Sequence, residues 1–255
     1  MKGTTMKNKT NPHELHQTLK YLNLPYMSNN YLELAQQASK KQWSHIDYLD
    51  NLAQGEADFK NDRSTQRRVR MARLPSIKTL DQFDWSWPKK INRLQIQNIF
   101  RLQFIEDMAN VIFIGGVGVG KTHLASALAY SACLNGYSAL FASAIDIVNT
   151  LSAAQNTGRM KQELKKYLKP DLLMIDELGF LPVDKKGADL LFQAISMRYE
   201  KSATIITTNR PYKEWPGIFN NDSTLTSAIL DRLLHHADTV IIEGLSYRMK
   251  DITDK

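Results

Sequence analysis

The sequence has almost no cysteine and no long run of apolar residues, and these absences exclude several classes of protein. The single cysteine, Cys133, cannot form a disulfide within the chain, so we expect a cytoplasmic protein rather than a disulfide-stabilised secreted one. No stretch approaches the roughly 18 apolar residues that a membrane-spanning helix needs, so no contact with a membrane is expected. The polar residues 1–17 also lack the apolar core of a signal peptide.

Acidic residues are fewer than basic ones, while the rest of the composition is that of a soluble globular chain. The 255 residues include 26 Asp and Glu against 33 Lys and Arg, which gives a formal net charge of +7. A basic balance favours an anionic partner such as nucleic acid, although many basic proteins bind none. Hydrophobic residues make up 43% of the chain, enough for one large or two modest domains with a buried core.

Residues 1–73 are predicted to form a small all-helical N-terminal domain. Apolar residues at helical spacing predict four helices, around residues 15–22, 31–38, 43–52 and 60–73. The polar residues 1–11 are expected to lack a fixed structure. The segment Lys60–Arg73 carries six basic residues against the single acid Asp62. Its basic face is either solvated or a surface that contacts DNA or a partner.

Glycines cluster at one place, between an apolar strand pattern and an amphipathic helix pattern. The run Val111–Ile114 is β-branched and aromatic, as buried strands are. It is followed by GGVGVGKT at residues 115–122, which satisfies the phosphate-loop pattern G-x-x-x-x-G-K-[ST]. In this context backbone N–H groups and a helix N-terminus bind phosphates. We therefore predict an ATP site formed by Gly115, Gly116, Val117, Gly118, Val119, Gly120, Lys121, Thr122 and His123.

The phosphate loop and a pair of acids predict a Mg²⁺-dependent hydrolytic site. Lys121 is predicted to reach the β- and γ-phosphates, and the Thr122 hydroxyl to ligate Mg²⁺. Asp176 and Glu177 end a nearly continuous apolar run, which predicts a buried parallel strand with its carboxyl end at the ligand crevice. Asp176 would then hold Mg²⁺ through water, and Glu177 would polarise the attacking water. The alternative is an ordinary strand end that enters a turn.

Two further residues each have two interpretations from the sequence. Asn209 follows the strand pattern at residues 204–208, where it either orients the lytic water or serves as a turn or cap residue. Arg232 lies near the end of a predicted helix at residues 226–236. It is either a surface residue or an arginine finger, a charge supplied to the γ-phosphate of a neighbouring subunit.

The second part of the chain, residues 91–255, alternates strand and helix patterns. After a helix pattern at residues 91–104, strands are predicted at residues 111–114, 138–142, 171–176, 204–208 and 239–243. This alternation predicts an α/β fold, in which right-handed connections join the strands of a parallel sheet that is covered on both faces. Residues 74–90 are predicted to be a linker that packs on a core. Its aromatic residues Phe83, Trp85 and Trp87 either only pack there or also line an adenine pocket.

A basic helical segment lies between the second and third predicted strands. The helix pattern at residues 145–168 is interrupted at Gly158, and its second half carries Arg159, Lys161, Lys165 and Lys166. Helical spacing brings Arg159, Lys165 and Lys166 near one another, with Lys161 on the flank. These four residues either form a solvated face or contact DNA phosphates.

The chain contains the phrases GGVGVGKTHLA, LLMIDELGFLP, TTNRPYKEW and DRLLHHADTVIIEGLSYR. Together these four phrases resemble the IstB family of AAA+ helper ATPases of bacterial insertion sequences, which is related to the helicase loader DnaC. The resemblance covers nearly the whole chain. It implies a P-loop NTPase domain with the sheet order 5-1-4-3-2, a sensor role for Asn209 and the finger role for Arg232. Because only about a dozen residues follow the last predicted strand, we expect no C-terminal lid and carry no second-sensor role over to Arg248.

The resemblance also implies a function. It implies an ATPase that assembles into a ring or filament of identical subunits, binds duplex DNA without strong sequence preference and delivers it to a partner transposase. A helicase loader of the DnaC type shares the ATPase part and remains an alternative. A small-molecule kinase is a further alternative, with a phosphate acceptor other than water. The pair Asp176-Glu177 followed by Asn209 favours water as the acceptor.

Overall fold

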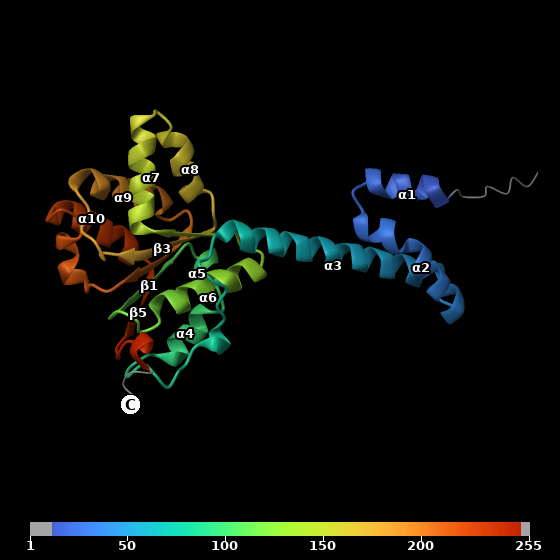
Figure 1. Ribbon diagram of the computed structural model, residues 1–255, viewed down its shortest axis with the longest axis horizontal. Helices are drawn as coiled ribbons and strands as arrows, with labels where there is room; N and C mark the ends of the chain where they lie inside the picture. The colour runs from blue at the N-terminus through green and yellow to red at the C-terminus, as the bar shows by residue number, and fades with distance from the viewer. Residues whose placement is uncertain (1–11, 251–255) are drawn as a thin grey trace, which may run out of the picture. The chain divides into compact units, whose positions relative to one another are not determined.

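The computed structural model describes residues 12–250, so the expectation for residues 1–11 lies outside the described residues. The chain divides into two compact units, Met1–Gln66 and Arg67–Lys255 (Figure 1). The division falls within a helix, seven residues before the boundary predicted at residue 73. None of the described helices is both long and apolar enough to cross a membrane.

The first unit is made of helices. Its helices are α1 (Pro12–Tyr21), α2 (Pro25–Lys41) and α3 (His45–Ala72), the last of which continues past residue 66. The prediction of separate helices at residues 43–52 and 60–73 was wrong, because α3 is one helix of 28 residues. Gly55 weakens a helix intrinsically, but the Tyr26 ring packs so closely that a Cβ at Gly55 would lie 2.1 Å from it. Tertiary packing therefore favours glycine in the middle of this helix.

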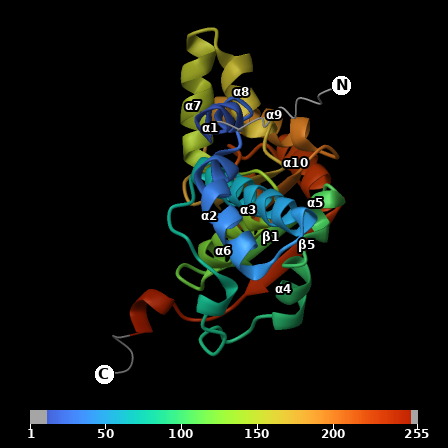
Figure 2. The same ribbon diagram turned by 90° about the vertical axis from the view of Figure 1, so that its right-hand side faces the viewer.

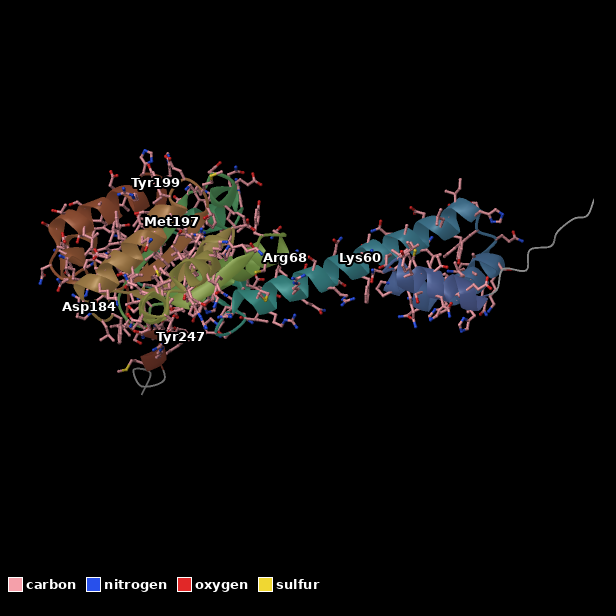
Figure 3. The ribbon with its side chains drawn as sticks, turned by 90° about the horizontal axis from the view of Figure 1, so that it is seen from above. Lys60, Arg68, Asp184, Met197, Tyr199 and Tyr247 are labelled. Atoms are coloured by element: carbon pink, nitrogen blue, oxygen red, sulfur yellow. The ribbon has the colours of Figure 1, made fainter. Side chains whose placement is uncertain are left out.

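The basic residues of Lys60–Arg73 lie along α3 and the residue after it, and Figure 3 labels Lys60 and Arg68 on this helix. Within the second unit, Arg68 Nε donates a hydrogen bond of 2.8 Å to the carbonyl oxygen of Cys133. Ala72 at the end of the helix is buried. The last turns of α3, from Arg67 on, are therefore part of the second unit, and Arg68 is not simply solvated.

The second unit is built on a five-stranded parallel sheet. The strands lie in the order β2-β3-β4-β1-β5, which confirms the predicted order read from the opposite edge. All neighbouring strands pair in parallel. Their bounds are β1 Asn110–Gly115, β2 Ala139–Ser143, β3 Leu172–Leu178, β4 Ala203–Thr208 and β5 Ala237–Ile242. The near-continuous burial of β1, β3 and β4 follows from the cover on both faces of the sheet.

Helices cover the sheet on both faces and form two cores. Along each strand alternate side chains face opposite cores, as Phe113 and Ile112 do on β1. Figures 1 and 2 show α4 and α6 on one side of the strands and α7 to α10 on the other. The bounds are α4 Arg93–Ile99, α5 Gln103–Glu106, α6 Lys121–Leu134, α7 Ala144–Asn156, α8 Met160–Leu168, α9 Lys185–Arg198 and α10 Ser223–Leu234.

Two predicted helices are divided in the structure, one as expected and one not. The break at Gly158 between α7 and α8 is confirmed, and Gly158 has a φ of +69°. The single helix predicted over residues 91–104 was wrong, because α4 ends at Ile99 and α5 begins at Gln103. Leu102 between them has a φ of +67°, and this turn lets both Leu102 and Phe104 enter the core. Helical spacing alone does not reveal such a turn.

The chain after β5 forms no lid domain within the described residues. It continues as the single 3₁₀ turn η3 (Tyr247–Met249). Two further 3₁₀ segments are η1 (Leu80–Gln82), before α4, and η2 (Tyr212–Gly217), after β4.

Candidate functional site

A cavity of about 760 Å³ lies at the carboxyl ends of β3 and β4, beside the loop that follows β1. Its walls come from the glycine loop 117–120 with the start of α6, from Glu177 and Phe180, from Thr207 to Asn209, from the segment 75–88 and from the residues after β5. Ligands of open parallel sheets bind at this edge. The volume lies within the range of about 300–1,000 Å³ that is typical of small-molecule sites.

The glycine loop curls tightly at the entry to α6. Gly118 and Gly120 have φ values of +74° and +100°, and Gly120 is the N-cap of α6. Lys121 Nζ donates hydrogen bonds to the carbonyl oxygens of Gly115 at 2.8 Å and Gly116 at 2.6 Å. Burial lowers the pKa of Lys121, an effect that the charges of Asp176 and Glu177 oppose. The ammonium group therefore lies over the loop, beside the N-terminus of a helix of 14 residues.

The predicted Mg²⁺ ligands lie in direct contact. Asp176 is buried, and its Oδ1 accepts a hydrogen bond of 2.9 Å from Thr122 Oγ1. A hydroxyl and a carboxylate are oxygen donors of the kind that Mg²⁺ prefers. The structure thus brings together Lys121, Thr122 and Asp176, although Thr122 and Asp176 are 54 residues apart in the sequence. These residues fit both a nucleotide phosphate chain and its metal ion.

The other predicted residues of the site divide into two groups. Glu177 and Asn209 line the same cavity as Lys121, so the structure brings them together as the sequence predicted. Arg232 does not reach this cavity. It lies beside Asn110 and Thr204, at the amino ends of β1 and β4. The cavity lies at the other, carboxyl ends of the strands. Arg232 Nη1 donates to the Ala228 carbonyl oxygen at 2.8 Å.

The segment before α4 supplies a wall that the sequence only suggested. Phe83 is buried in a core and also lines the cavity, as Trp87 does, so the predicted packing is confirmed for Phe83 and contact with adenine stays a prediction. The Phe83 ring is packed so close to the glycine loop that a Cβ at Gly120 would lie 2.6 Å from it. The Phe83 ring also meets the His123 ring edge to face, with centroids 5.5 Å apart. The mixture of proline and aromatic residues was the only signal for this wall.

The residues after β5 form another wall, which sequence reasoning missed apart from the phrase S-Y-R. The backbone N–H of Tyr247 donates to the Gly118 carbonyl oxygen at 2.9 Å. A Cβ at Gly118 would lie only 2.1 Å from Ser246 Oγ, so the close contact between these two residues requires glycine at position 118. Tyr247 and Arg248 line the cavity, and the charge of Arg248 contributes to the lowered pKa of Lys121.

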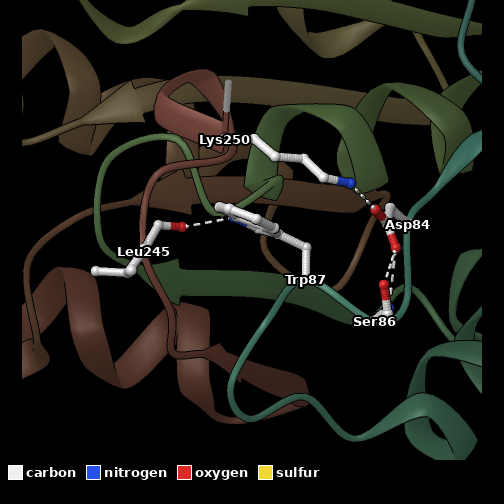
Figure 4. A network of polar contacts seen from close by, with 5 residues as sticks. All are labelled: Asp84, Ser86, Trp87, Leu245 and Lys250. Atoms are coloured by element: carbon white, nitrogen blue, oxygen red, sulfur yellow. Dashed lines mark hydrogen bonds and ion pairs between the residues drawn. The ribbon is translucent and has the colours of Figure 1, made fainter. Parts of the chain in front are cut away.

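Figure 4 shows how these two walls are joined. Trp87 Nε1 donates to the Leu245 carbonyl oxygen at 3.0 Å, and Lys250 Nζ donates to Asp84 Oδ2 at 3.0 Å. Hydrogen bonds from Ser86 and from Lys250 lower the pKa of Asp84 to about 2. The segments 84–87 and 245–250 therefore form one continuous border of the cavity at neutral pH.

The predicted DNA-contacting residues lie outside the cavity, on and just before α8. Arg159, Lys161, Lys165 and Lys166 are all exposed, whereas Leu164 and Tyr167 on the same segment are buried. In the helix, Lys161 and Lys165 lie one turn apart. Lys166 forms an ion pair of 2.5 Å with Glu163. The segment is therefore an amphipathic helix with a basic exposed side.

Comparison with known proteins places this architecture in a family. The family of IstB-like ATP binding proteins matches residues 17–254. A relative from Bacillus thuringiensis subsp. berliner, described as a putative ATP-binding protein of insertion sequence IS232, is 39% identical over 238 residues, which cover 93% of this chain and 95% of the relative.

Solved structures show the same fold. DnaA from Aquifex aeolicus bound to AMPPCP matches with a TM-score of 0.55 and 25% identity, over 71% of this chain and 55% of the DnaA chain. The DnaC helicase loader matches with a TM-score of 0.52 and 23% identity, over 65% of this chain and 96% of the loader. The glycine loop, the parallel sheet and the match over almost all of the sequence all indicate the same family. This chain therefore belongs to the family of IstB-like ATP-binding proteins of insertion sequences, which have the AAA+ fold.

Proposed function

We propose that this protein is an ATPase that assembles on duplex DNA and delivers it as target to a partner transposase. The observation that supports this most is that Lys121, Thr122 and Glu177 line one cavity, while the buried Asp176 accepts a hydrogen bond from Thr122. The relatives from insertion sequences supply the context of transposition. The helicase-loader alternative rests on fold alone, since the DnaC loader is 23% identical.

In the proposed mechanism, the loop residues 115–122 bind the phosphates of ATP through their N–H groups. The Lys121 ammonium exchanges the carbonyl oxygens of Gly115 and Gly116 for the β- and γ-phosphates. The Thr122 hydroxyl and the Asp176 carboxylate would hold Mg²⁺, which offsets the charge of the phosphates when bound. Glu177 accepts a proton from the attacking water, and Asn209 orients that water.

The place of Arg232 supports the proposed assembly. This residue lies at the amino ends of the strands, opposite the cavity of its own chain, and we propose that its guanidinium serves the cavity of a neighbouring subunit. ATP would then lie between subunits and favour a ring or filament. Electron microscopy of the protein with duplex DNA, with and without ATP, tests this proposal. Ordered assemblies on DNA only with ATP are expected, and dispersed monomers under all conditions would contradict it.

We expect the basic side of α8 to contact DNA phosphates. Replacing Lys161 and Lys165 together by Ala should weaken DNA binding and reduce the log–log salt slope by about two, because each lost phosphate contact removes about one. DNA affinity should be measured across a range of salt concentrations with ATP present. Both side chains are exposed, so folding should be unaffected.

The matched control for this measurement is the replacement of Lys40 and Lys41, two exposed lysines at the end of α2. This change removes the same charge and should leave the slope near that of the unmodified protein. If the α8 variant instead keeps the unmodified slope and affinity, the DNA site lies elsewhere, and the basic run Lys60–Arg73 becomes the next surface to test.

A further inference from the structure

Thr207 contacts both acids of the cavity with a single hydroxyl group. Its Oγ1 donates a hydrogen bond of 2.5 Å to Asp176 Oδ1 and accepts one of 3.0 Å from the backbone N–H of Glu177. The side chain is fully buried, on the strand next to the one that carries the two acids. A hydroxyl can donate and accept at the same time, which a carbonyl, a carboxylate or an ammonium group cannot.

The contact lies at an irregularity in the pairing of β3 with β4. The strands pair regularly as far as Ile175 with Ile206, and pairing resumes at Leu178 with Thr208. Two residues of β3, Asp176 and Glu177, therefore lie opposite the single residue Thr207, which is the arrangement of a β-bulge. Such a bulge takes backbone groups out of the regular ladder, and here the Thr207 hydroxyl accepts from the Glu177 N–H.

The bulge changes the direction of the Glu177 side chain. In a regular strand, Asp176 and Glu177 would point to opposite faces of the sheet. Glu177 instead has a φ of +59°, in the left-handed region that residues other than glycine rarely adopt. With this backbone it lines the cavity, while Asp176 contacts Thr122 in the same site. Strained backbone of this kind persists only where surrounding contacts hold it.

We propose that Thr207 is a positioning residue for hydrolysis: its hydroxyl holds the bulge that directs Glu177 at the attacking water and orients Asp176. This inference rests on the proposed ATPase function. The Thr207 hydroxyl is engaged by the two acids, so it acts through them rather than on the phosphates or the water. Its loss should therefore slow turnover without weakening nucleotide binding, because the glycine loop and Lys121 are unchanged.

The test compares three variants with the unmodified protein in the presence of DNA. Thr207→Val keeps the shape of the side chain and removes the hydroxyl, so kcat for ATP should fall about 100-fold, within the range of a mispositioned general base. Affinity for a non-hydrolysable ATP analogue should stay within about threefold of the unmodified value, since the phosphate contacts remain. Thr207→Ser keeps the hydroxyl and should retain most of the turnover. Thr226→Val is the matched control, because this buried threonine lies outside the cavity walls and the surroundings of Arg232, and its hydroxyl donates only to the Asp222 carbonyl oxygen, so kcat should be nearly unchanged.

Thermal unfolding of each variant accompanies the kinetics. If Thr207→Val does not fold, Thr207→Ala, which also lacks the hydroxyl and adds no bulk, takes its place with the same expected loss. Full turnover in the variant without the hydroxyl, or equal loss in Thr207→Ser, would overturn the proposal. An unmodified protein without ATPase activity would instead contradict the proposed function, so the two failures are distinguishable.

Discussion

Replacing Glu177 by Gln is expected to slow ATP hydrolysis at least about 100-fold while ATP still binds. The amide keeps the size of the side chain but cannot accept the proton of the attacking water. The groups that would hold the phosphates and the metal ion, Lys121, Thr122 and Asp176, remain in place. Phosphate release under steady-state conditions measures the loss, and a fluorescent ATP analogue measures binding. We expect this variant to accumulate in the assembled, DNA-bound state.

Two further variants define what this result means. Lys121→Ala should lose ATP binding itself, because it removes the cation that meets the β- and γ-phosphates. Glu214→Gln changes a glutamate that pairs with Arg210 outside the cavity walls and should leave turnover nearly unchanged. If Glu177→Gln and Lys121→Ala both bind and hydrolyse ATP as the unmodified protein does, the nucleotide site is assigned wrongly.

Replacing Arg232 by Ala is expected to reduce hydrolysis about 10³-fold or more, the range found for arginine fingers. The fold should tolerate the change, because Arg232 is only partly buried, with contacts to the Ala228 carbonyl oxygen and the Phe192 ring. ATPase activity and thermal unfolding measure the two effects. Arg93→Ala is the matched control, since Arg93 also stacks on an aromatic ring, that of Trp85, but lies neither at the cavity walls nor in the surroundings of Arg232.

Mixing two inactive variants tests whether Arg232 acts on a neighbouring subunit. A mixed assembly of Arg232→Ala and Glu177→Gln contains some interfaces in which an intact cavity meets an intact arginine. Part of the activity should therefore return, with a maximum at intermediate ratios. Absence of any recovery, in samples where mixed assembly has been verified, would argue against a role across the interface.

The residues that the sequence located correctly are those whose signals are local. The strand patterns at residues 111–114, 171–176 and 204–208 are confirmed because a buried parallel strand needs an apolar run wherever it lies. The glycine loop is recognisable because its backbone conformations demand glycine at fixed spacing. The meeting of Thr122 with Asp176 also follows from sequence, since parallel strands end at one edge of the sheet. The strand order came with the family resemblance.

The rest was decided by contacts between distant segments. Glycine at residue 55 is compatible with one continuous helix because the Tyr26 ring occupies the space of a side chain. Trp87 meets the Leu245 carbonyl oxygen across 158 residues of sequence, and no local pattern records that contact. The backbone N–H of Glu177 donates to the hydroxyl of Thr207, 30 residues away on the neighbouring strand, and no local pattern predicts this contact either. By itself the sequence determined the alternation of strands and helices and the chemical groups of the candidate site. Tertiary structure decided which segments enclose those groups and where their side chains point, because enclosure and side-chain direction depend on long-range packing rather than on local periodicity.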